Sequence, residues 1–151
     1  MAGGEKKRSA GGASDPGGRL RGLLPFLLAA LAACGPFSRD FRVSGTITLA
    51  SPLQRRVPRA NAVLFVIAKN RGGVPLAVLR IVNPRFPVSF TMTEQDLLVP
   101  GSRPREPLEL QVQMNTHGNV GMPVPGDLEG VHPDLVRPGE RRVHVVIDRQ
   151  I

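Results

Sequence analysis

Two apolar runs separated by a short glycine-containing turn dominate the hydrophobic pattern between Asn61 and Val82. The first run, 63–67, is apolar without interruption, which is typical of a strand that is covered on both faces. The second run begins at Pro75, and because proline lacks an amide hydrogen, this residue belongs at a strand start or at a sheet edge. The pattern predicts a β-hairpin over 61–82, around which the rest of the fold is arranged.

Shorter stretches on both sides of the hairpin alternate apolar and polar residues with a period of two, as half-buried strands do. In the stretch 108–114, Glu109, Gln111 and Gln113 alternate with apolar residues, so this strand is expected to have one face in solvent. Proline and glycine turns separate the stretches and keep each of them short. The predicted strands outside the hairpin are 41–49, 88–92, 108–114 and 143–147, with a further short edge piece at 120–122.

Helix signals are weak in this part of the chain. Thr93, with Asp96 three residues later, predicts a single helical turn, which Pro100 ends. The glycine- and proline-rich stretch 123–133 is predicted to be a loop around Asp127. Together these patterns predict an all-β fold, a small antiparallel β-sandwich of six or seven short strands, with little or no helix outside a signal peptide.

The composition agrees with one β domain. The chain has 151 residues, enough for about one domain, and its 17 glycines and 15 prolines favour turns over long helices. Tryptophan and tyrosine are absent, so the core must be built mainly from Val, Leu, Ile and the six Phe residues. An aromatic platform for stacking nucleic-acid bases is therefore hard to build.

The net charge of the chain is +8, but part of it belongs to the N-terminal leader. The first 33 residues contain five basic and two acidic residues, which leaves about +5 on the remainder. The tight basic groups there are Arg55, Arg56 and Arg59, and the pair Arg141 and Arg142. No nucleic-acid-binding motif accompanies them, so no nucleic-acid partner is expected. The charge suits an anionic lipid surface or an acidic partner.

The N-terminal segment has the pattern of an export signal. Arg19 and Arg21 precede the eleven apolar residues 23–33, and small residues end the run. The sequence Leu-Ala-Ala-Cys-Gly at 31–35 is similar to a bacterial lipobox, in which the cysteine receives a diacylglyceryl group and the signal is cleaved before it. Lipidation of Cys34 is therefore predicted. Cleavage that leaves a free thiol and an uncleaved anchor are the alternatives, although the run is shorter than the ~20 residues of a spanning helix.

The predicted organisation has three parts. Residues 1–33 form a disordered leader with a lipoprotein signal peptide, 34–40 form a tether and 41–151 form the β-sandwich domain. The expected location is the cell envelope, where the lipid anchor holds the domain to a membrane on the periplasmic side. Gly35 follows the cysteine in place of a retention aspartate, which leaves both the inner and the outer membrane open. Cys34 is the only cysteine, so dithiol redox chemistry is excluded.

A series of short motifs runs through the predicted domain. They are Val63–Ala68, Pro75–Val78, Phe90–Met92, Pro100–Gly101, Gly118–Asn119, Pro125–Leu128 with Gly130, Pro138–Gly139 and Val145–Asp148. In type and order they resemble the C-terminal domain of cytochrome c-type biogenesis proteins of the CycH (CcmI) type. The resemblance covers roughly 43–149 and implies an immunoglobulin-like sandwich, here as a stand-alone lipoprotein domain.

The resemblance also implies a function. Members of that family sit on the outer face of the cytoplasmic membrane and help to present unfolded apocytochrome c to the haem ligation machinery, largely through helical tetratricopeptide repeats. No such repeat occurs in this sequence. The resemblance therefore implies a non-enzymatic accessory or binding module in c-type cytochrome biogenesis, with apocytochrome c or biogenesis proteins as partners. The alternative is a general envelope lipoprotein with an immunoglobulin-like interaction domain unrelated to haem.

Side chains that often bind metals do not combine into a predicted site. No pair among His117, His132 and His144 has a short ligand spacing on one element, so they are expected to be solvated or structural, with no metal bound. Met92 and Met114 alternate with polar residues and are expected in the core rather than in contact with haem or copper. Binding is instead expected at the backbone, where an exposed strand edge or the loop region 118–138 accepts an extended peptide by strand addition.

Catalysis is not expected. Asp127 and Glu129 flank Leu128 and could be read as paired carboxylates, but an aspartate after glycine more often caps its own turn. The sequence has no Ser-His-Asp, Cys-His or glycine-rich phosphate signature, so no catalytic residue, no cofactor and no enzyme activity are predicted. A small hydrolase or a metal carrier is the remaining rival class.

Overall fold

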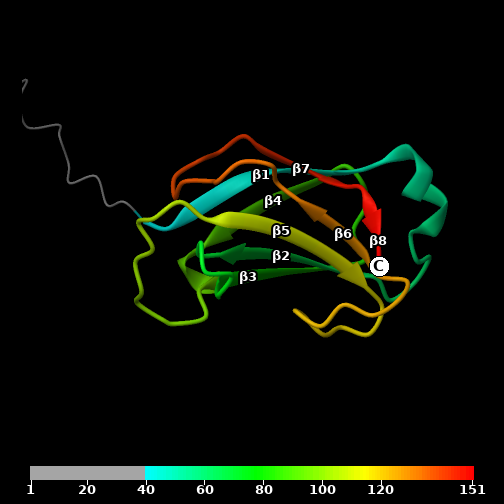
Figure 1. Ribbon diagram of the computed structural model, residues 1–151, viewed down its shortest axis with the longest axis horizontal. Helices are drawn as coiled ribbons and strands as arrows, with labels where there is room; N and C mark the ends of the chain where they lie inside the picture. Colours follow the sequence, from blue (N-terminus) through cyan, green and yellow to red (C-terminus); the bar gives the residue numbers. More distant parts are fainter. Residues whose placement is uncertain (1–39) are drawn as a thin grey trace, which may run out of the picture. The chain divides into compact units, whose positions relative to one another are not determined.

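Eight strands arranged in two sheets make up residues 40–151, which are the residues that the computed structural model describes (Figure 1). The predicted leader and signal peptide, and Cys34 with most of the predicted tether, lie outside the described residues. The strands are β1 Arg42–Leu49, β2 Val63–Lys69, β3 Pro75–Val82, β4 Val88–Thr93, β5 Glu109–Asn115, β6 Leu128–Val131, β7 Val143–Ile147 and β8 Arg149–Gln150.

Helix is confined, within the same residues, to two 3-10 segments, η1 Ser51–Arg56 and η2 Glu94–Asp96. Neither of them is long and apolar enough to cross a bilayer. The predicted turn at Thr93 is confirmed as η2, where the amide of Thr93 donates to Oδ2 of Asp96 at 2.7 Å. The prediction of an all-β sandwich with little helix is confirmed for the domain.

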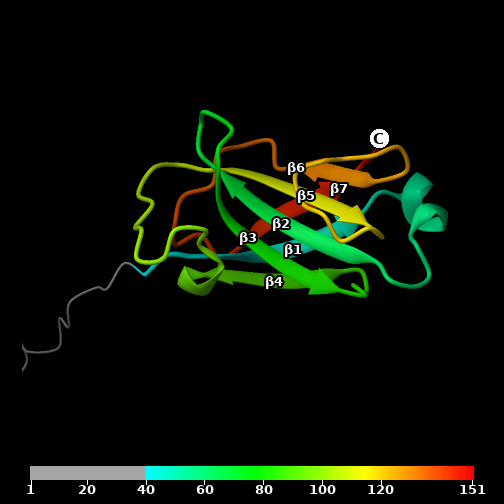
Figure 2. The same cartoon turned by 90° about the horizontal axis from the view of Figure 1, so that it is seen from below.

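The smaller sheet has the strand order β4-β1-β7, and the larger has the order β3-β2-β5-β6-β8. Every ladder is antiparallel except the one between β1 and β7, which is parallel. The parallel ladder arises because the chain leaves β6 in the larger sheet and crosses to the smaller one before β7 begins (Figures 1 and 2). At this one ladder the fold departs from the antiparallel pairing that the sequence predicts.

The predicted hairpin is confirmed as the pair β2 and β3. The side chain of Asn70 holds its turn, since its Oδ1 accepts hydrogen bonds from the amides of Gly72 (3.0 Å) and Val74 (2.9 Å). Gly73 follows with φ +78°, a conformation that favours glycine. Pro75 begins β3, which is an edge strand, so its missing amide hydrogen does not break the hydrogen bonding between strands inside the sheet.

β2 is buried on both faces, as its apolar sequence predicts. Leu64 and Val66 face the main core between the sheets, whereas Val63, Phe65 and Ile67 form a second cluster on the opposite face. The predicted core positions Met92 and Met114 are confirmed, with 0% and 1% of their surface exposed. The fully buried members of the main core include Val43, Ile47, Leu64, Val66, Met92, Leu108, Leu110, Val112, Val136, Val145 and Ile147.

Two glycines allow β7 to run close to both sheets. A Cβ atom on Gly45 would lie 1.8 Å from the carbonyl oxygen of Val143, and one on Gly130 would lie 2.1 Å from that of Val146. These distances are far shorter than any real contact, so β7 can pass β1 and β6 only where no side chain intervenes. One side of the sandwich is closed in this way, and β3 and β4 border the other side (Figure 2).

Two predictions about the region after β5 are wrong. The stretch predicted as a loop around Asp127 contains β6, which pairs with β5, and β8 adds a further strand beside it. The edge piece predicted at 120–122 is not a strand. Because Gly130 breaks the apolar pattern and only Leu128 marks the inward face clearly, β6 is formed by its neighbours rather than by local sequence preference.

Candidate binding surfaces

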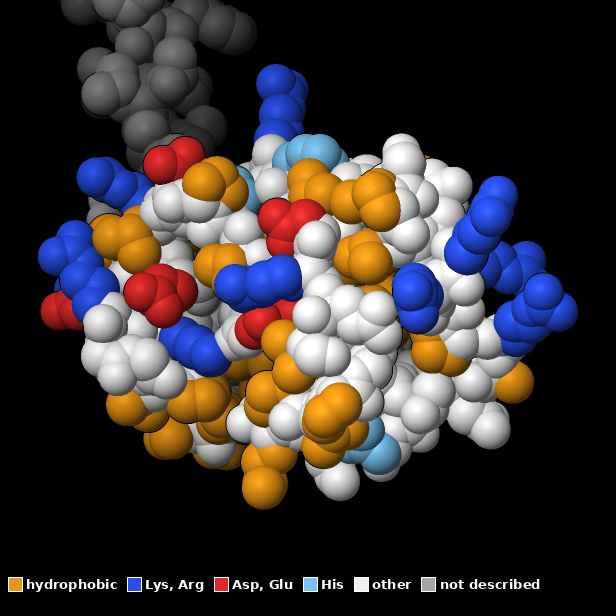
Figure 3. Space-filling model, turned by 45° about the vertical axis from the view of Figure 1, so that its right-hand side comes forward, with side chains coloured by type: hydrophobic (Ala, Val, Ile, Leu, Met, Phe, Trp, Pro, Cys, Tyr) orange, Lys and Arg blue, Asp and Glu red, His pale blue; other side chains and the backbone are white. Residues whose placement is uncertain are grey.

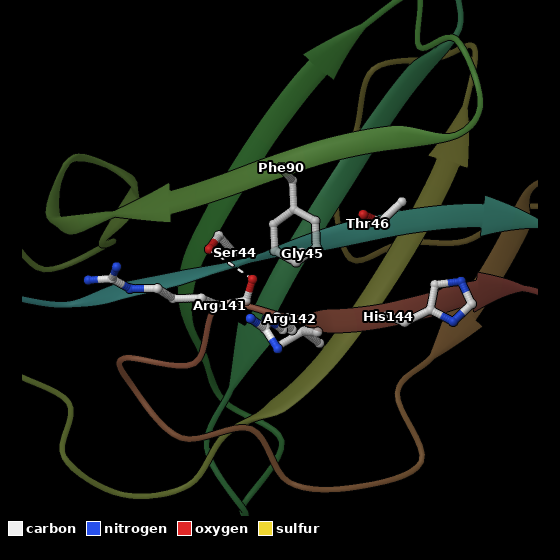
Figure 4. A pocket seen from close by; sticks show the side chains of 8 residues that line it. Ser44, Gly45, Thr46, Phe90, Arg141, Arg142 and His144 are labelled. Carbon is white, nitrogen blue, oxygen red and sulfur yellow. Dashed lines mark hydrogen bonds between the residues drawn. The ribbon is translucent and has the colours of Figure 1, made fainter.

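A shallow pocket of about 490 Å³ lies over the first half of β1 and the start of β7 (Figure 4). The parallel register places Gly45 beside Val143 and Thr46 beside His144. Three strands and the segment before β7 contribute to the pocket, so it exists only when the smaller sheet is assembled. Its lining consists of Ser44, Gly45, Thr46, Phe90, Arg141, Arg142, Val143 and His144.

Backbone hydrogen bonds fix the basic side of this pocket. The amide of Gly139 donates to the carbonyl of Arg42 at 2.6 Å, and the amide of Ser44 donates to the carbonyl of Glu140 at 3.0 Å. These two bonds hold the segment that leads into β7 against the start of β1. As a result Arg141 and Arg142, which follow directly, line the pocket on the side of Ser44, and the side chain of Arg141 extends away from Thr46 and His144 (Figure 4).

The polar groups of the pocket can donate hydrogen bonds but are not arranged for nucleophilic catalysis. The ring Nε2 of His144 lies 2.9 Å from Oγ1 of Thr48, and the hydroxyl of Ser44 faces the carbonyl oxygen of Arg141 at 3.5 Å. The imidazole is therefore not bonded to the serine that it would have to activate. The pocket suits binding of a polar, electron-rich group rather than covalent chemistry.

β4 is the longest strand edge that the described residues leave open. It pairs with β1 on one side and is the edge of the smaller sheet. Its sequence, Val-Ser-Phe-Thr-Met-Thr, contains no charged residue, although charges commonly protect edge strands from unwanted pairing. Next to this edge, the half-buried side chains of Leu79, Ile81 and Phe86 pack against the core. An extended segment could therefore find both backbone partners and apolar surface here.

The other edges are shorter or covered. The amide of Leu98 donates to the carbonyl of Leu76 at 2.9 Å, which occupies the first part of β3. The close approach of Gly130 to the carbonyl of Val146 blocks the free side of β7. β8 has two residues, and the backbone next to it is already bonded, since the amide of Gly126 donates to the carbonyl of Ile151 at 2.9 Å.

Asp127 holds the loop that follows β5, as its predicted turn-capping role requires. Its Oδ2 accepts hydrogen bonds from the amide of Val124 (2.9 Å) and from Nε2 of Gln113 (3.4 Å), and lies 3.1 Å from Nε2 of His117. Nδ1 of His117 accepts a hydrogen bond from the amide of Asn119 at 3.2 Å, so in the neutral ring Nε2 carries the proton and donates it to Asp127. Asp127 is thus a structural carboxylate.

Two buried amides in β5 were not predicted. Gln113 and Asn115 are each 2% exposed, so the prediction that one face of this strand lies in solvent is wrong for the second half of the strand. The loop 116–126 covers that half and is bonded to it: Oε1 of Gln113 accepts from the amide of Gly121 (3.1 Å), and Oδ1 of Asn115 from that of Gly118 (2.9 Å). The alternation of polar residues in β5 gives no signal that a later loop will cover them.

Residues 43–148 match the family model described as the cytochrome c-type biogenesis protein H Ig-like domain. The chain belongs to this family. The matched residues run from β1 through β7 and contain the whole lining of the pocket as well as the open edge of β4. The resemblance noted in the sequence is thereby confirmed, and the two candidate surfaces belong to the Ig-like domain itself.

A curated relative is similar to this chain over much of its length. An uncharacterized protein of Aquifex aeolicus (strain VF5) is 28% identical over 108 residues, which are 71% of this chain and 70% of the relative. No solved structure gives a significant match.

The three histidines of the Ig-like domain have separate surroundings. His117 contacts Asp127, His144 contacts Thr48, and Nδ1 of His132 lies 2.8 Å from the carbonyl oxygen of Asp134. Among residues 40–151, no group of three or more His, Cys, Asp or Glu side chains is arranged to hold a metal ion. Glu129 is not paired with Asp127 but contacts Gln111 and, at 2.8 Å, the guanidinium of Arg149.

Asp127→Ala should release the loop 116–126 and lower the free energy of unfolding by about 2–3 kcal/mol, because it leaves a buried amide and two further donors without an acceptor. Urea denaturation measures the loss, and hydrogen exchange at the amides of Gly121 and Val124 should accelerate. Asp134→Ala, at an exposed aspartate, is the matched control and should change neither quantity. Equal exchange in the two variants would show that the network does not hold the loop.

Proposed function

We propose that this chain is a non-enzymatic, lipid-anchored accessory module in c-type cytochrome biogenesis, and that it binds an extended segment of a protein in that process. The observation that carries the proposal is the family match over residues 43–148, which spans nearly all of the sandwich. The open edge of β4 supports a binding role, and the absence of a nucleophile paired with a base in the pocket is consistent with it.

The anchor in this proposal is a lipid on Cys34, in the cell envelope and facing the periplasm. Support comes from the order of features in the sequence: a basic flank, an eleven-residue apolar run, small residues and then the cysteine. β1 begins at Arg42, so a linker of a few residues would join the lipid to the folded domain. The lipid would raise the local concentration of the domain near partners on the same membrane.

The binding mechanism in this proposal is strand addition at β4. A segment of apocytochrome c or of a biogenesis protein would pair with the free backbone groups of Val88–Thr93, and its alternate side chains would contact Leu79, Ile81 and Phe86. The loop region 118–138, which the sequence offered as a second acceptor, is less suitable. β6 already has partners on both sides, and Asp127 ties the loop before it to the sheet.

Deletion of the gene, followed by haem staining of membrane proteins, tests this function. The deletion should lower the amount of mature c-type cytochromes several-fold, and the wild-type chain should restore it. A Cys34→Ser chain should restore less, because it would lack the lipid that holds it at the membrane. The mass of the mature wild-type protein should include the lipid.

Unchanged c-type cytochromes in the deletion strain would contradict the role in haem-protein biogenesis and favour a general envelope lipoprotein. Full restoration by the Cys34→Ser chain would leave the family role in place and remove the need for the anchor. The two parts of the proposal are therefore tested separately by one set of strains.

A further inference from the structure

The pocket over β1 and β7 has a chemical bias that strand addition does not use. Its lining supplies the guanidinium groups of Arg141 and Arg142, the hydroxyls of Ser44 and Thr46, and the imidazole of His144. No Asp or Glu lines it. Such a set attracts an oxyanion, because it combines positive charge with several donors and no side chain repels negative charge.

The surface around the pocket extends this bias. The apolar residues of β1 and β4 point into the core, so the residues that alternate with them project from the outer face of the smaller sheet. No carboxylate is among them. Of the nearby acids, Asp96 accepts a hydrogen bond from the amide of Thr93 at 2.7 Å, and Glu140 accepts one from the amide of Arg137 at 3.0 Å. These outward residues are Arg42, Ser44, Thr46, Thr48, Ser89, Thr91 and Thr93.

The number of donors distinguishes between kinds of oxyanion. A carboxylate has two oxygens, whereas a phosphate ester presents three strong acceptor oxygens and carries more negative charge. The hydroxyl of Ser44 already faces the carbonyl oxygen of Arg141, and the ring of His144 contacts Thr48, but the two guanidinium groups and the hydroxyl of Thr46 still supply more donors than two carboxylate oxygens require. The geometry points to a binding site for a phosphate group, held by the guanidinium groups of Arg141 and Arg142 and by the hydroxyl of Thr46.

The position of the pocket in the chain favours a phospholipid as the source of that phosphate; this step rests on the proposed lipid anchor. Ser44 is ten residues after Cys34, and ten residues span at most about 34 Å when fully extended. The pocket would therefore stay close to the headgroups of the membrane that holds Cys34. A phosphate bound there would fix how the domain faces the bilayer.

Apolar side chains at the same end of the sandwich are consistent with this orientation. Val74, Leu98 and Val99 are 55%, 55% and 64% exposed. They lie at the end of the sandwich where β1 begins. Arg42 at the start of β1 pairs with Thr93 at the end of β4. The chain then passes through η2, and Leu97 pairs with Ala77 near the start of β3. Figure 3 shows acidic and basic side chains mixed on the left of its view, and basic side chains without acidic neighbours on the right. The distribution of charge therefore does not by itself determine which end of the domain faces the membrane.

A titration in solution tests the pocket. Residues 40–151 have their own core and are expected to fold alone. Glycerol 3-phosphate should shift the NMR amide signals of Ser44–Thr46 and of Val143 and His144 in a saturable manner. The double variant Arg141→Ala/Arg142→Ala should bind at least about tenfold more weakly, as expected for lost charge-assisted hydrogen bonds. The matched control Arg55→Ala/Arg56→Ala, which removes two exposed arginines from η1, should bind as the wild type does.

The outcomes separate the pocket from the anchor, because the titrated protein lacks Cys34. Saturable shifts that are lost in the pocket variant and kept in the control support the site. Absence of saturable shifts, or equal loss in both variants, overturns it. Tighter binding of a polyglutamate peptide than of the phosphate ester also overturns it, in favour of an acidic protein segment.

Vesicles distinguish the two sources of phosphate. The same protein should sediment with phosphatidylglycerol vesicles more than with vesicles of a phosphate-free glycolipid, and Arg141→Ala/Arg142→Ala should reduce the difference. Binding of glycerol 3-phosphate without binding to phospholipid vesicles would keep the phosphate site and assign it to a soluble phosphate ester.

Discussion

Gly45→Ala should lower the free energy of unfolding by roughly 3 kcal/mol or prevent folding, because the new Cβ would lie 1.8 Å from the carbonyl oxygen of Val143. The obstacle is backbone in a central ladder, so relief requires β7 to move away from β1. That movement would open the core between the sheets, where Val145 and Ile147 are fully buried. Urea denaturation followed by circular dichroism measures the loss.

Gly72→Ala provides the comparison for this prediction. This glycine lies in the exposed β2–β3 turn, and an added Cβ would meet only the side-chain oxygen of Asn70 at 3.3 Å. We expect a change below about 1 kcal/mol, since a side chain can shift by the few tenths of an ångström required. Similar losses in the two variants would show that the close β1–β7 ladder does not limit stability.

Leu64→Ala should destabilise the domain by about 3 kcal/mol, within the range that large-to-small substitutions in cores produce. Leu64 is 0% exposed and lies in β2 between Ile81 of β3 and Met114 of β5. The cavity would therefore open in the main core between the sheets. Thermal and urea unfolding should both report the change.

Val82→Ala is the control for this core substitution. Val82 lies in the same hairpin but is 56% exposed, so its truncation should change the free energy of unfolding by less than about 0.5 kcal/mol. A loss at Leu64 no larger than that at Val82 would mean that the hairpin is not central to the core.

Local sequence was sufficient to predict the hairpin and most strands. In β2 and β3 the apolar runs, the glycine turn and the position of Pro75 lie within about twenty residues of one another. The two strands and their turn can therefore be predicted without knowing which other strands they contact. The same holds for the alternating strands β1, β4 and β7, and for the capped turn at Thr93. These elements form where local preference and tertiary packing agree.

The parts that the sequence did not predict depend on contacts between distant residues. β6 forms because it pairs with β5 and β8. The need for glycine at position 130 becomes clear only from the nearby carbonyl of Val146. The burial of Gln113 depends on a loop that folds back later in the chain. Composition and spacing give no information on such coverage.

The pocket illustrates the same limit for function. The sequence singles out Arg141 and Arg142 as a basic pair and His144 as a candidate ligand, but it does not place them beside Ser44. Almost one hundred residues separate the two sides, which are joined by the parallel ladder of β1 and β7 and by the backbone bonds next to it. Parallel pairing of distant strands cannot be inferred from alternation alone.

Both proposed contacts use the smaller sheet. β4 offers its edge, and the start of β1 and of β7 forms the pocket on the outer face. The two sites differ in chemistry, since one pairs backbone groups and the other binds a charged group. A single domain could therefore hold an extended segment while its orientation at the membrane is fixed.

Site-specific photocrosslinking in cells tests the central claim, that the open edge of β4 binds a protein of c-type cytochrome biogenesis. A photoreactive phenylalanine derivative would replace Thr91, which is exposed on β4, and in a separate strain Val131, which is exposed on the interior strand β6. We predict an adduct at position 91 with apocytochrome c or with a cytochrome c biogenesis protein, identified by mass spectrometry, and none at 131. Adducts at both positions in equal amounts, or no such protein at position 91, would contradict the account.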